Sequence, residues 1–425
     1  MKTDDRLTDL RFTPPEVLKV LLSLNTGKAT GADNIGNFLL KQTAHVIAEP
    51  LCQLFNYSLR TGKFPSAWKK SNVVPVHKKN DRQNKDNYRP ISLLCNISKV
   101  FERLVHLKLY DFLNSRGLHT SKNSGFRKGD GTTNQLVSIV NKIQKGLDDG
   151  HDVRMVFLDL SKAFDKVWHK GLLFKLECVG MGGSLLSWFE SYLTDRSQRV
   201  VINGQSSEFL PVETGVPQGS TLGPLLFLIY MNDIVDNISC DINLFADDTS
   251  LLEVMSDPVR NTENLNRDLQ TLSAWAAQWL MYFNVLKTVL MTFSLKRQTH
   301  CPPVMFDGTP LPETKTHTHL GLTLTTNLSW DAHIDRLITK AGKYNNILKR
   351  LKYLLPRATI DTLYKTKIRP ILEYANEIYD NCSIKYSNKL ERFQVVTARI
   401  CTGCPLFTDS RKLLLEVGWE NTIKL

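Results

Sequence analysis

The sequence predicts an α+β fold, in which an antiparallel sheet backed by helices is followed by a purely helical region. Strand-like and helical segments alternate over residues 152–294, and from residue 330 onward the apolar spacing is helical throughout. The 425 residues are 42% hydrophobic and 23% charged, which is typical of a globular chain and excludes a disordered one. This length allows two or three structural units.

The elements follow in order from the N-terminus. Residues 1–60 are predicted to be helical, because apolar residues such as Val17 and Leu21 recur at helical spacing and Pro14-Pro15 marks a helix start. We then expect a strand over 72–77 and helices over 99–115 and 132–147. In the last hundred residues we expect helices over 332–351, 358–374 and 386–400.

Two adjacent acids, Asp247 and Asp248, stand between the strand-like segments 241–246 and 249–254. This pattern predicts a hairpin with the acid pair at its tip. Adjacent carboxylates repel each other, and Mg²⁺ relieves the repulsion because it takes hard oxygen ligands. Most acid pairs in turns are simply solvated, so the pair alone is weak evidence for a metal site.

A third acid upstream stands in a matching context. Asp159 ends a buried-strand pattern over 153–159, and residues 161–167 have the pattern of a helix start. Two neighbouring strands with acids at their ends would gather three carboxylates around a pair of metal ions. That arrangement is typical of phosphoryl transfer, in which two metals clamp the attacking and leaving oxygens.

In these motifs, the chain resembles the reverse transcriptases of non-LTR (LINE-type) retrotransposons. Three segments are similar to that family's palm motifs in order and spacing: VFLDLSKAFDKV at 156–167, GVPQGSTLGPLLFLIYMNDI at 215–234 and FADDT at 245–249. Other segments resemble its opening, fingers, fourth palm and primer-contacting motifs, at 27–35, 72–79, 87–92, 124–129, 287–291 and 319–322. The resemblance runs from about residue 12 to about residue 418.

The resemblance implies a right-hand polymerase fold with fingers, a palm built on the antiparallel sheet and a helical thumb. Residues 1–60 would be an N-terminal helical extension, 61–325 the fingers and palm, and 326–425 the thumb and C-terminal region. It implies an RNA-directed DNA polymerase that extends a primer 3′ end on an RNA template by two-metal nucleotidyl transfer. Relatives of this branch usually carry an endonuclease ahead of the polymerase, so we expect a piece of a longer protein that polymerises without nicking its target.

The resemblance also assigns chemical roles. Asp159, Asp247 and Asp248 would hold two Mg²⁺ ions, which Mn²⁺ could replace. Lys287 would protonate the pyrophosphate leaving group, unless it is an ordinary exposed lysine at a strand end. Phe164 would pack under the sugar of the incoming nucleotide and favour deoxynucleotides, unless it is simply a core phenylalanine.

The nucleotide and the primer would have further contacts. The remaining nucleotide-binding candidates are the side chains or backbone N–H groups of Lys78, Arg127, Lys162, Ala163, Gln218 and Gly219. Leu320 and Gly321 would position the primer end. The competing interpretations are solvated basic residues for Lys78 and Arg127, and ordinary turns for Gln218-Gly219 and Leu320-Gly321.

The charge balance suits a nucleic-acid partner. Lys and Arg number 54 against 42 Asp and Glu, which gives a net charge of +12. The expected partners are an RNA template, a DNA primer and dNTPs, with basic helices after residue 330 following the duplex backbone. The longest apolar run, 225–231, is too short for a bilayer. Eight scattered cysteines and no signal peptide indicate an intracellular protein, and action at chromosomal sites would place it in the nucleus.

Two other interpretations stay open at this point. A decayed or co-opted copy would bind nucleic acid without polymerising, although the three acids, Phe164 and Gln218-Gly219 are all present. An intron-type maturase would share the polymerase core and use it largely to bind RNA structure. The match after Trp330, which includes residues 390–394, favours the retrotransposon branch.

Overall fold

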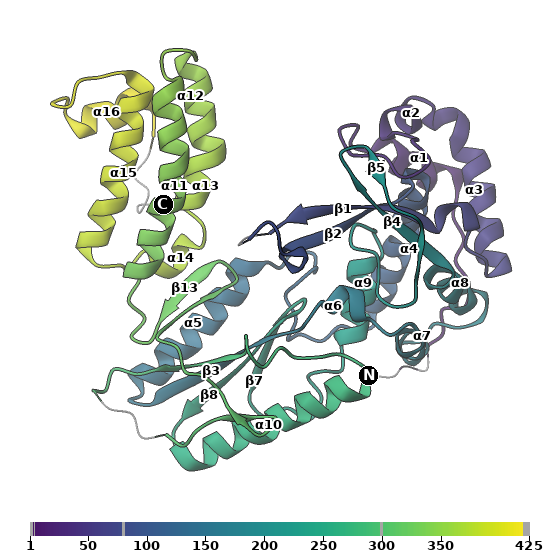
Figure 1. Ribbon diagram of the computed structural model, residues 1–425, viewed down its shortest axis with the longest axis horizontal. Helices are drawn as coiled ribbons and strands as arrows, with labels where there is room; N and C mark the ends of the chain where they lie inside the picture. Colours follow the sequence, from purple (N-terminus) through teal and green to yellow (C-terminus); the bar gives the residue numbers. More distant parts are fainter. Residues whose placement is uncertain (1–2, 4, 79–80, 298–300, 420–425) are drawn as a thin grey trace. The chain divides into compact units, whose positions relative to one another are not determined.

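The computed structural model describes all residues except 1–2, 4, 79–80, 298–300 and 420–425 (Figure 1). The chain forms two compact units, and it passes between them several times. The first unit comprises Met1–Lys128, Leu158–Thr249 and Asp268–Val285. The second comprises Gly129–Phe157, Ser250–Arg267 and Leu286–Leu425.

The first unit begins with helices, as predicted. They are α1 (Pro14–Leu22), α2 (Asn37–Gln42), α3 (Ala44–Thr61) and α4 (Asn96–Ser115). Thr13 and Glu16 form a capping box at the start of α1, where Glu16 Oε2 accepts the Thr13 backbone N–H at 2.8 Å. Pro14 follows at the first helical position, where its missing N–H costs nothing.

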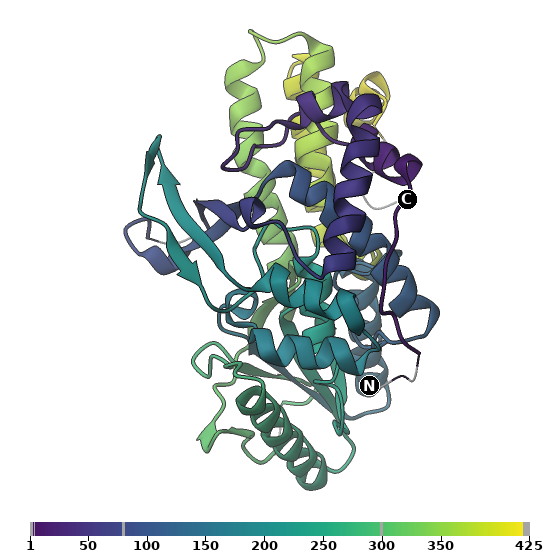
Figure 2. The same cartoon turned by 90° about the vertical axis from the view of Figure 1, so that its right-hand side faces the viewer.

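A sheet of short strands follows in the first unit. Its strands are β1 (Lys70–His77), β2 (Tyr88–Leu93), β4 (Arg196–Ile202), β5 (Gln205–Ser206) and β6 (Leu210–Val212). The β1–β2 pair is an antiparallel hairpin, and β1 also pairs with β4 in parallel. The β4–β5 ribbon, drawn in teal, projects from this sheet (Figure 2). The short helices η1 (Ser66–Trp68) and η2 (Lys85–Asn87) flank β1 and β2.

Five further helices come between and after the predicted acid-bearing strands in the chain. They are α6 (Ala163–Lys166), α7 (His169–Cys178), α8 (Gly183–Leu193), α9 (Gly223–Met231) and α10 (Pro258–Gln278). Every residue of α9 except Pro224 is buried, as expected for a helix that is apolar all round. The helix expected over 161–167 is a single turn, α6, because Lys162 takes a left-handed conformation that delays the helix start.

The predicted acid-bearing strands form one sheet, in the order β7-β8-β3-β9. Their bounds are Asp241–Phe245 (β7), Asp248–Met255 (β8), Asp152–Asp159 (β3) and Val289–Phe293 (β9). The first seven residues of β3 are all buried, including the charged side chains of Asp152 and Arg154. The β3–β9 pair is antiparallel, with Val153 opposite Phe293, so the antiparallel pairing predicted from sequence is confirmed.

The second unit is mainly helical after residue 330, as predicted. Its further elements are α5 (Thr132–Asp148), β10 (Met305–Phe306), β11 (Thr309–Pro310), β12 (Thr316–His319), β13 (Leu322–Thr325), α11 (Asp331–Leu351), α12 (Arg357–Leu363), α13 (Arg369–Leu372), α14 (Asn376–Tyr379), α15 (Ile384–Thr402) and α16 (Ser410–Val417). The continuous helix expected over 358–374 is instead interrupted by a π-helical turn at Tyr364–Ile368. Pro370 follows at the start of α13, and its missing N–H cannot continue a regular α-helix.

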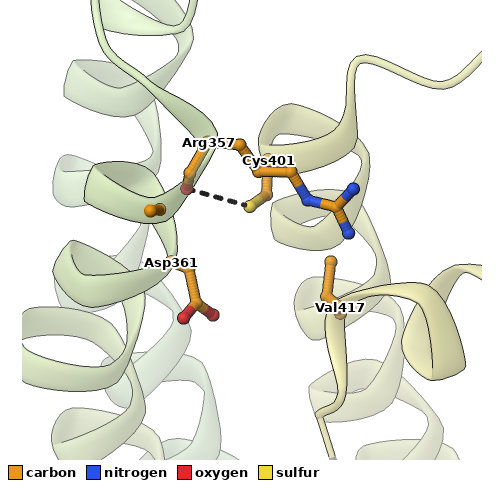
Figure 3. A pocket seen from close by; sticks show the side chains of 5 residues that line it. Arg357, Asp361, Cys401 and Val417 are labelled. Carbon is orange, nitrogen blue, oxygen red and sulfur yellow. Dashed lines mark hydrogen bonds between the residues drawn. The ribbon is translucent and has the colours of Figure 1, made fainter.

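A hollow of about 400 Å³ lies between α12 and α15 in the second unit (Figure 3). Arg357, Asp361, Cys401 and Val417 line it, and the Cys401 thiol faces the Arg357 carbonyl. Cys404, which follows Cys401 at C-x-x-C spacing, is half-buried and also a free thiol. None of the predicted site residues lines this hollow. Across the described residues, no helix combines the length and apolar character that a membrane crossing requires.

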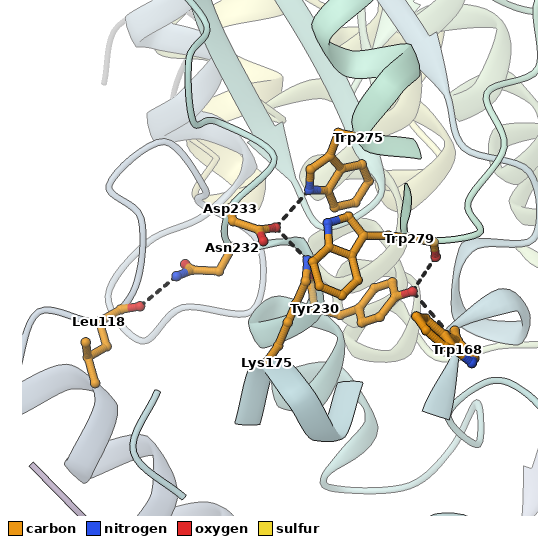
Figure 4. A network of polar contacts seen from close by, with 8 residues as sticks. All are labelled: Leu118, Trp168, Lys175, Tyr230, Asn232, Asp233, Trp275 and Trp279. Atoms are coloured by element: carbon orange, nitrogen blue, oxygen red, sulfur yellow. Dashed lines mark hydrogen bonds and ion pairs between the residues drawn. The ribbon is translucent and has the colours of Figure 1, made fainter. Parts of the chain in front are cut away.

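A buried lysine ties α7, α9 and α10 together in the first unit (Figure 4). Lys175 Nζ donates to Asp233 Oδ1 and to the Tyr230 carbonyl, both at 2.5 Å, and lies 3.7 Å from the centre of the Trp279 ring. The Trp275 indole N–H donates to the same Asp233 oxygen at 2.8 Å. Burial lowers the pKa of Lys175 to about 8, against the opposing attraction of Asp233.

We expect Asp233→Ala to destabilise the protein by about 1.5 kcal/mol at pH 7, because it removes the acid that stabilises charged Lys175, and a lysine with a pKa of about 8 can lose its proton at pH 7 for about that cost. The folded pKa of Lys175 lies below its unfolded value of 10.5, so this lysine's contribution to stability rises as pH increases from about 8 to 10.5. The variant lowers that pKa further. Its loss of unfolding free energy relative to the wild type should therefore be largest below pH 8 and shrink above it. Urea unfolding at pH 7 and 9.5 measures this.

The control is Glu190→Ala, which removes an exposed glutamate of α8 that is not among the charges acting on Lys175, and it should change stability by no more than about 0.5 kcal/mol. A deficit for Asp233→Ala that is the same at both pH values would show that lost packing, rather than an unpaired lysine, is responsible.

Candidate active site

The acid pair lies at the tip of the β7–β8 hairpin, as predicted. Ala246 and Asp247 form the turn, and Asp248 begins β8. Ala246 has a φ of 58°, a left-handed conformation that alanine rarely adopts. Such strain persists only where the surroundings hold it, and it is common at functional sites.

The segment that holds this turn is Asn123-Ser124-Gly125. Asn123 Oδ1 accepts the backbone N–H groups of Gly125 at 2.9 Å and Ala246 at 3.3 Å. The Ser124 N–H donates to the Leu244 carbonyl at 3.0 Å. A Cβ on Gly125 would come within 2.5 Å of the Ala246 nitrogen, closer than any stable contact. Gly125 therefore permits the backbone approach that fixes the tip of the hairpin.

Asp159 ends β3 with a half-buried side chain. Its carbonyl accepts the Asn284 N–H at 2.8 Å, and the Ser161 N–H donates to the Tyr282 carbonyl at 2.9 Å. These bonds fix the backbone on either side of Leu160. Asp159 is electrostatically coupled to both Asp247 and Asp248, so the three predicted acids share one region of the first unit.

Burial and the neighbouring acids disfavour the charged forms of Asp247 and Asp248. Burial is the main cause that raises the pKa of Asp248 to about 6, and the charges of Asp247 and Asp159 raise it further. The pKa of Asp247 is raised by burial and by Asp159. Arg89 opposes both shifts, and Lys78 opposes that of Asp247, so two basic residues from the β1–β2 hairpin face the acids.

The donor chemistry of this cluster fits a divalent cation. Within the described ranges, Asp247 and Asp248 form no ion pair with a basic side chain. No cationic group in direct contact therefore offsets the repulsion between their carboxylates. Carboxylate oxygens are the ligands that Mg²⁺ prefers. Among the described side chains, no three His, Cys, Asp or Glu residues already stand in a metal-holding arrangement. The assignment of all three acids as ligands remains a prediction.

Phe164 lies at the start of α6 beside this cluster and is half-buried. Its ring stacks on that of Phe227 in α9, with 4.4 Å between centroids and 18° between planes. The Phe126 ring approaches Phe164 edge-on, at 6.1 Å and 86°. Phe164 is thus neither fully in the core nor free in solvent, and a part of it remains available to a ligand.

Gln218 and Gly219 lie against β2. The Gln218 carbonyl accepts the Ser92 N–H at 2.7 Å, and its side-chain amide donates to Asp165 Oδ1 at 2.8 Å. Gly219 has a φ of 122°, and a Cβ there would come within 2.5 Å of the Ser92 carbonyl oxygen. Only glycine fits this position. A cavity of about 360 Å³ borders Gln218, Asp165 and Ser92.

A buried acid that sequence reasoning missed holds the next part of this loop. Glu102 in α4 is fully buried, and its Oε2 accepts the N–H groups of Thr221 at 2.7 Å and Leu222 at 3.3 Å. Its Oε1 accepts the Ser98 hydroxyl at 3.0 Å. Burial raises the pKa of Glu102, against the attraction of Arg196 and these hydrogen bonds. Glu102 caps the start of α9 and so fixes the end of the Gln218-Gly219 segment.

The other predicted nucleotide contacts in the first unit differ in their exposure and in whether they already have a partner within the protein. Lys78 is exposed, and the Lys162 side chain pairs with Asp86 at 3.2 Å. The backbone N–H groups of Lys162 and Ala163 find no acceptor among the described residues. Arg127 is half-buried and donates to the Thr120 carbonyl at 3.1 Å, so part of its guanidinium is already hydrogen-bonded within the protein.

Lys287, Leu320 and Gly321 belong to the second unit. Lys287 is exposed, in the turn before β9. Leu320 and Gly321 form the two-residue turn of the β12–β13 hairpin, with φ values of 45° and 86°.

Two side chains that the sequence did not indicate hold the β12–β13 turn. The Tyr374 hydroxyl donates to the Leu320 carbonyl at 2.5 Å, and Arg336 Nη1 donates to the Gly321 carbonyl at 3.1 Å. Both come from the helical region after residue 330. The turn is therefore a supported element of the second unit.

Comparison with known proteins adds family information to this geometry. The family model described as "Reverse transcriptase (RNA-dependent DNA polymerase)" matches residues 76–324. The chain is 29% identical to the RNA-directed DNA polymerase from mobile element jockey and 31% identical to the probable RNA-directed DNA polymerase from transposon X-element, both of Drosophila melanogaster. These alignments cover 94% and 95% of this chain and 45% of each relative, so the chain spans less than half the length of these relatives.

A third Drosophila melanogaster protein, the probable RNA-directed DNA polymerase from transposon BS, is 30% identical over 94% of this chain and 45% of its own length. Among solved structures, apo telomerase from Candida tropicalis, truncated from its C-terminal domain, is similar with a TM-score of 0.42 and 12% identity. That match covers 61% of this chain and 54% of the telomerase chain.

Proposed function

Because the chain belongs to the reverse transcriptase family, we propose that it extends a primer 3′ end with deoxynucleotides on an RNA template, as part of a LINE-like retrotransposon protein. The observation that carries this proposal is the grouping of Asp159, Asp247 and Asp248, in which burial and, after it, the neighbouring acids raise the pKa of the two hairpin acids. Reverse transcriptases use divalent metal ions, and we propose two Mg²⁺ ions for this site, which Mn²⁺ could replace.

The bound metal ions would lower the pKa of the primer hydroxyl and stabilise the charge of the departing pyrophosphate. Asp159, Asp247 and Asp248 carry the carboxylate oxygens that would hold them. Gly125 and Asn123 keep the hairpin tip in place, so that the acids are positioned before the substrate arrives.

The protein's other groups would orient the nucleotide and the primer. Lys78 and Arg127 would contact the triphosphate, together with the backbone N–H groups of Lys162 and Ala163. Phe164 would pack against the sugar, and Gln218-Gly219 would lie beside the new base pair. In the second unit, Leu320-Gly321 would contact the primer end, and Lys287 would supply a proton to pyrophosphate.

Primer extension tests the proposal. The purified protein is given a DNA primer on an RNA template, with dNTPs and Mg²⁺, and the same reaction with EDTA is the control. We expect extension that requires both template and metal. A folded protein that binds RNA without extending the primer would instead support the alternative, a co-opted nucleic-acid-binding protein.

The raised pKa of Asp248 predicts a pH dependence for metal binding. The acid must lose its proton to bind a cation, so the apparent Mg²⁺ affinity should fall about tenfold per pH unit below about pH 6. Above pH 6 this proton no longer competes, and the affinity should level off. Calorimetric titration with Mg²⁺ at pH 5, 6 and 7 measures the effect.

Asp248→Asn is the matched variant for this experiment, because its amide has no proton to lose. It should bind Mg²⁺ more weakly at pH 7 and show a flatter pH profile. A profile as steep as that of the wild type would mean that another group sets the pH dependence.

A further inference from the structure

Phe126 combines two features that are costly for folding. Its backbone has a φ of 56°, in the left-handed region where a bulky residue is strained. Its side chain is 53% exposed, so it forgoes much of the stabilisation that a buried aromatic ring supplies. Strained residues cluster at ligand-binding sites, where the strain presents a side chain to a ligand.

The neighbours of Phe126 place it within the candidate active site. The preceding residue, Gly125, lies against the backbone of Phe245 and Ala246, directly before the acid pair. On its other side, the Phe126 ring contacts Phe164 edge-on. The main chain at Phe126 is therefore tied to the hairpin tip, while its ring reaches the residue expected to contact the nucleotide sugar.

Phe126 ends a row of three aromatic rings. Phe227 is fully buried, Phe164 is half-buried and stacks on it, and Phe126 stands exposed at the outer end. The edge-to-face contact orients the Phe126 and Phe164 rings relative to each other. The row thus continues the apolar core out to the surface beside the acids.

We propose that Phe126 is a specificity-determining residue, whose exposed ring forms with Phe164 the apolar wall against the sugar of the incoming nucleotide. The inference rests on the proposed polymerase function. A deoxyribose carbon packs on such a wall at no polar cost. A ribose 2′ hydroxyl held there would lose its hydrogen bonds to water without gaining a partner. Phe126 therefore disfavours ribonucleotides directly, and it also holds Phe164 in orientation.

Single-nucleotide incorporation opposite a template adenine, with dTTP or UTP, tests the assignment. For Phe126→Gly we expect the ratio of kcat/KM for dTTP to that for UTP to fall about tenfold or more. Glycine adopts positive φ without strain, so the melting temperature should stay equal or rise. A purely structural phenylalanine would give the opposite result, a lower melting temperature with unchanged selectivity.

Two further variants sharpen the test. Phe126→Tyr keeps the ring and should keep the selectivity. Leu280→Gly provides the matched control, because Leu280 has a φ of 54° and is 46% exposed but follows α10. It should relieve similar strain and leave the dTTP preference unchanged.

The outcomes separate this inference from the proposed function. The assignment of Phe126 to the wall against the nucleotide sugar is overturned if Phe126→Gly leaves the ratio of kcat/KM for dTTP to that for UTP unchanged. An equal fall in kcat/KM for both nucleotides is such an outcome. If the wild-type protein does not extend primers, the polymerase proposal fails, and equilibrium binding of dTTP and UTP to the protein–primer–template complex decides the assignment. A dTTP preference that is lost in Phe126→Gly then supports it, and no preference in the wild type overturns it.

Discussion

Asp247→Asn should abolish primer extension, with a loss of about a thousandfold or more. Asparagine keeps the size of the side chain but removes the negative charge that a divalent cation requires. Metal ions contribute several kcal/mol to the stabilisation of phosphoryl-transfer transition states, and each 1.36 kcal/mol corresponds to about tenfold in rate. Steady-state extension on an RNA template, at saturating Mg²⁺ and again at saturating Mn²⁺, measures the loss.

A folding defect would not explain this loss. Asp247 is destabilised in its charged form by burial and by Asp159, so replacing it should leave the melting temperature of the metal-free protein equal or higher. The control is Asp257→Asn, just beyond the other end of β8, where Asp257 accepts the Val259 N–H at 3.1 Å. Asparagine caps helices as well as aspartate does, so this variant should polymerise normally. Substantial extension by Asp247→Asn would exclude a ligand role for Asp247.

The parts of the molecule that were predictable from sequence are those that local patterns determine. Apolar, strand-like runs locate β7, β8 and the end of β3, so the acids fall at strand ends in the sequence and in the structure. Family membership confirms the predicted α+β, right-hand polymerase fold class. The division into an extension, fingers with palm, and thumb stays a prediction.

The residues that support the site were not predictable in the same way, because their partners are distant in the chain. Asn123 meets Ala246, Glu102 meets Thr221, and Tyr374 meets Leu320. No pattern within one segment encodes such pairs. Glu102 did leave a signal, since it stands among the buried residues of an amphipathic helix, where a charge needs a partner.

The irregular backbone conformations also escaped prediction. Lys162 and Ala246 adopt positive φ although neither is glycine, and each shifts the local structure away from its simplest pattern. At Lys162 the result is a single helical turn in place of the longer helix expected from residue 161 onward. At Ala246 it is the tight turn that carries the acids. Both conformations depend on tertiary contacts that a propensity argument does not contain.

Glu102→Ala should destabilise the first unit strongly, at a cost of about 3–5 kcal/mol. It would leave the N–H groups of Thr221 and Leu222 and the Ser98 hydroxyl without their buried acceptor, and Arg196 without its negative partner. Urea unfolding of the variant against the wild type measures the cost. Glu190→Ala, an exposed glutamate in α8, is the control and should lie within about 0.5 kcal/mol of the wild type.

Glu102→Gln separates stability from positioning. Its amide keeps one acceptor oxygen, so we expect a smaller loss of about 1–3 kcal/mol and a folded protein at 25 °C. Because Glu102 fixes the loop that follows Gln218-Gly219, the KM for dNTPs should rise several-fold while kcat changes less. A variant with lower stability but an unchanged KM would mean that Glu102 only supports the fold. Ser98→Ala, which removes a single donor to the same carboxylate, should shift both quantities in the same direction by a smaller amount.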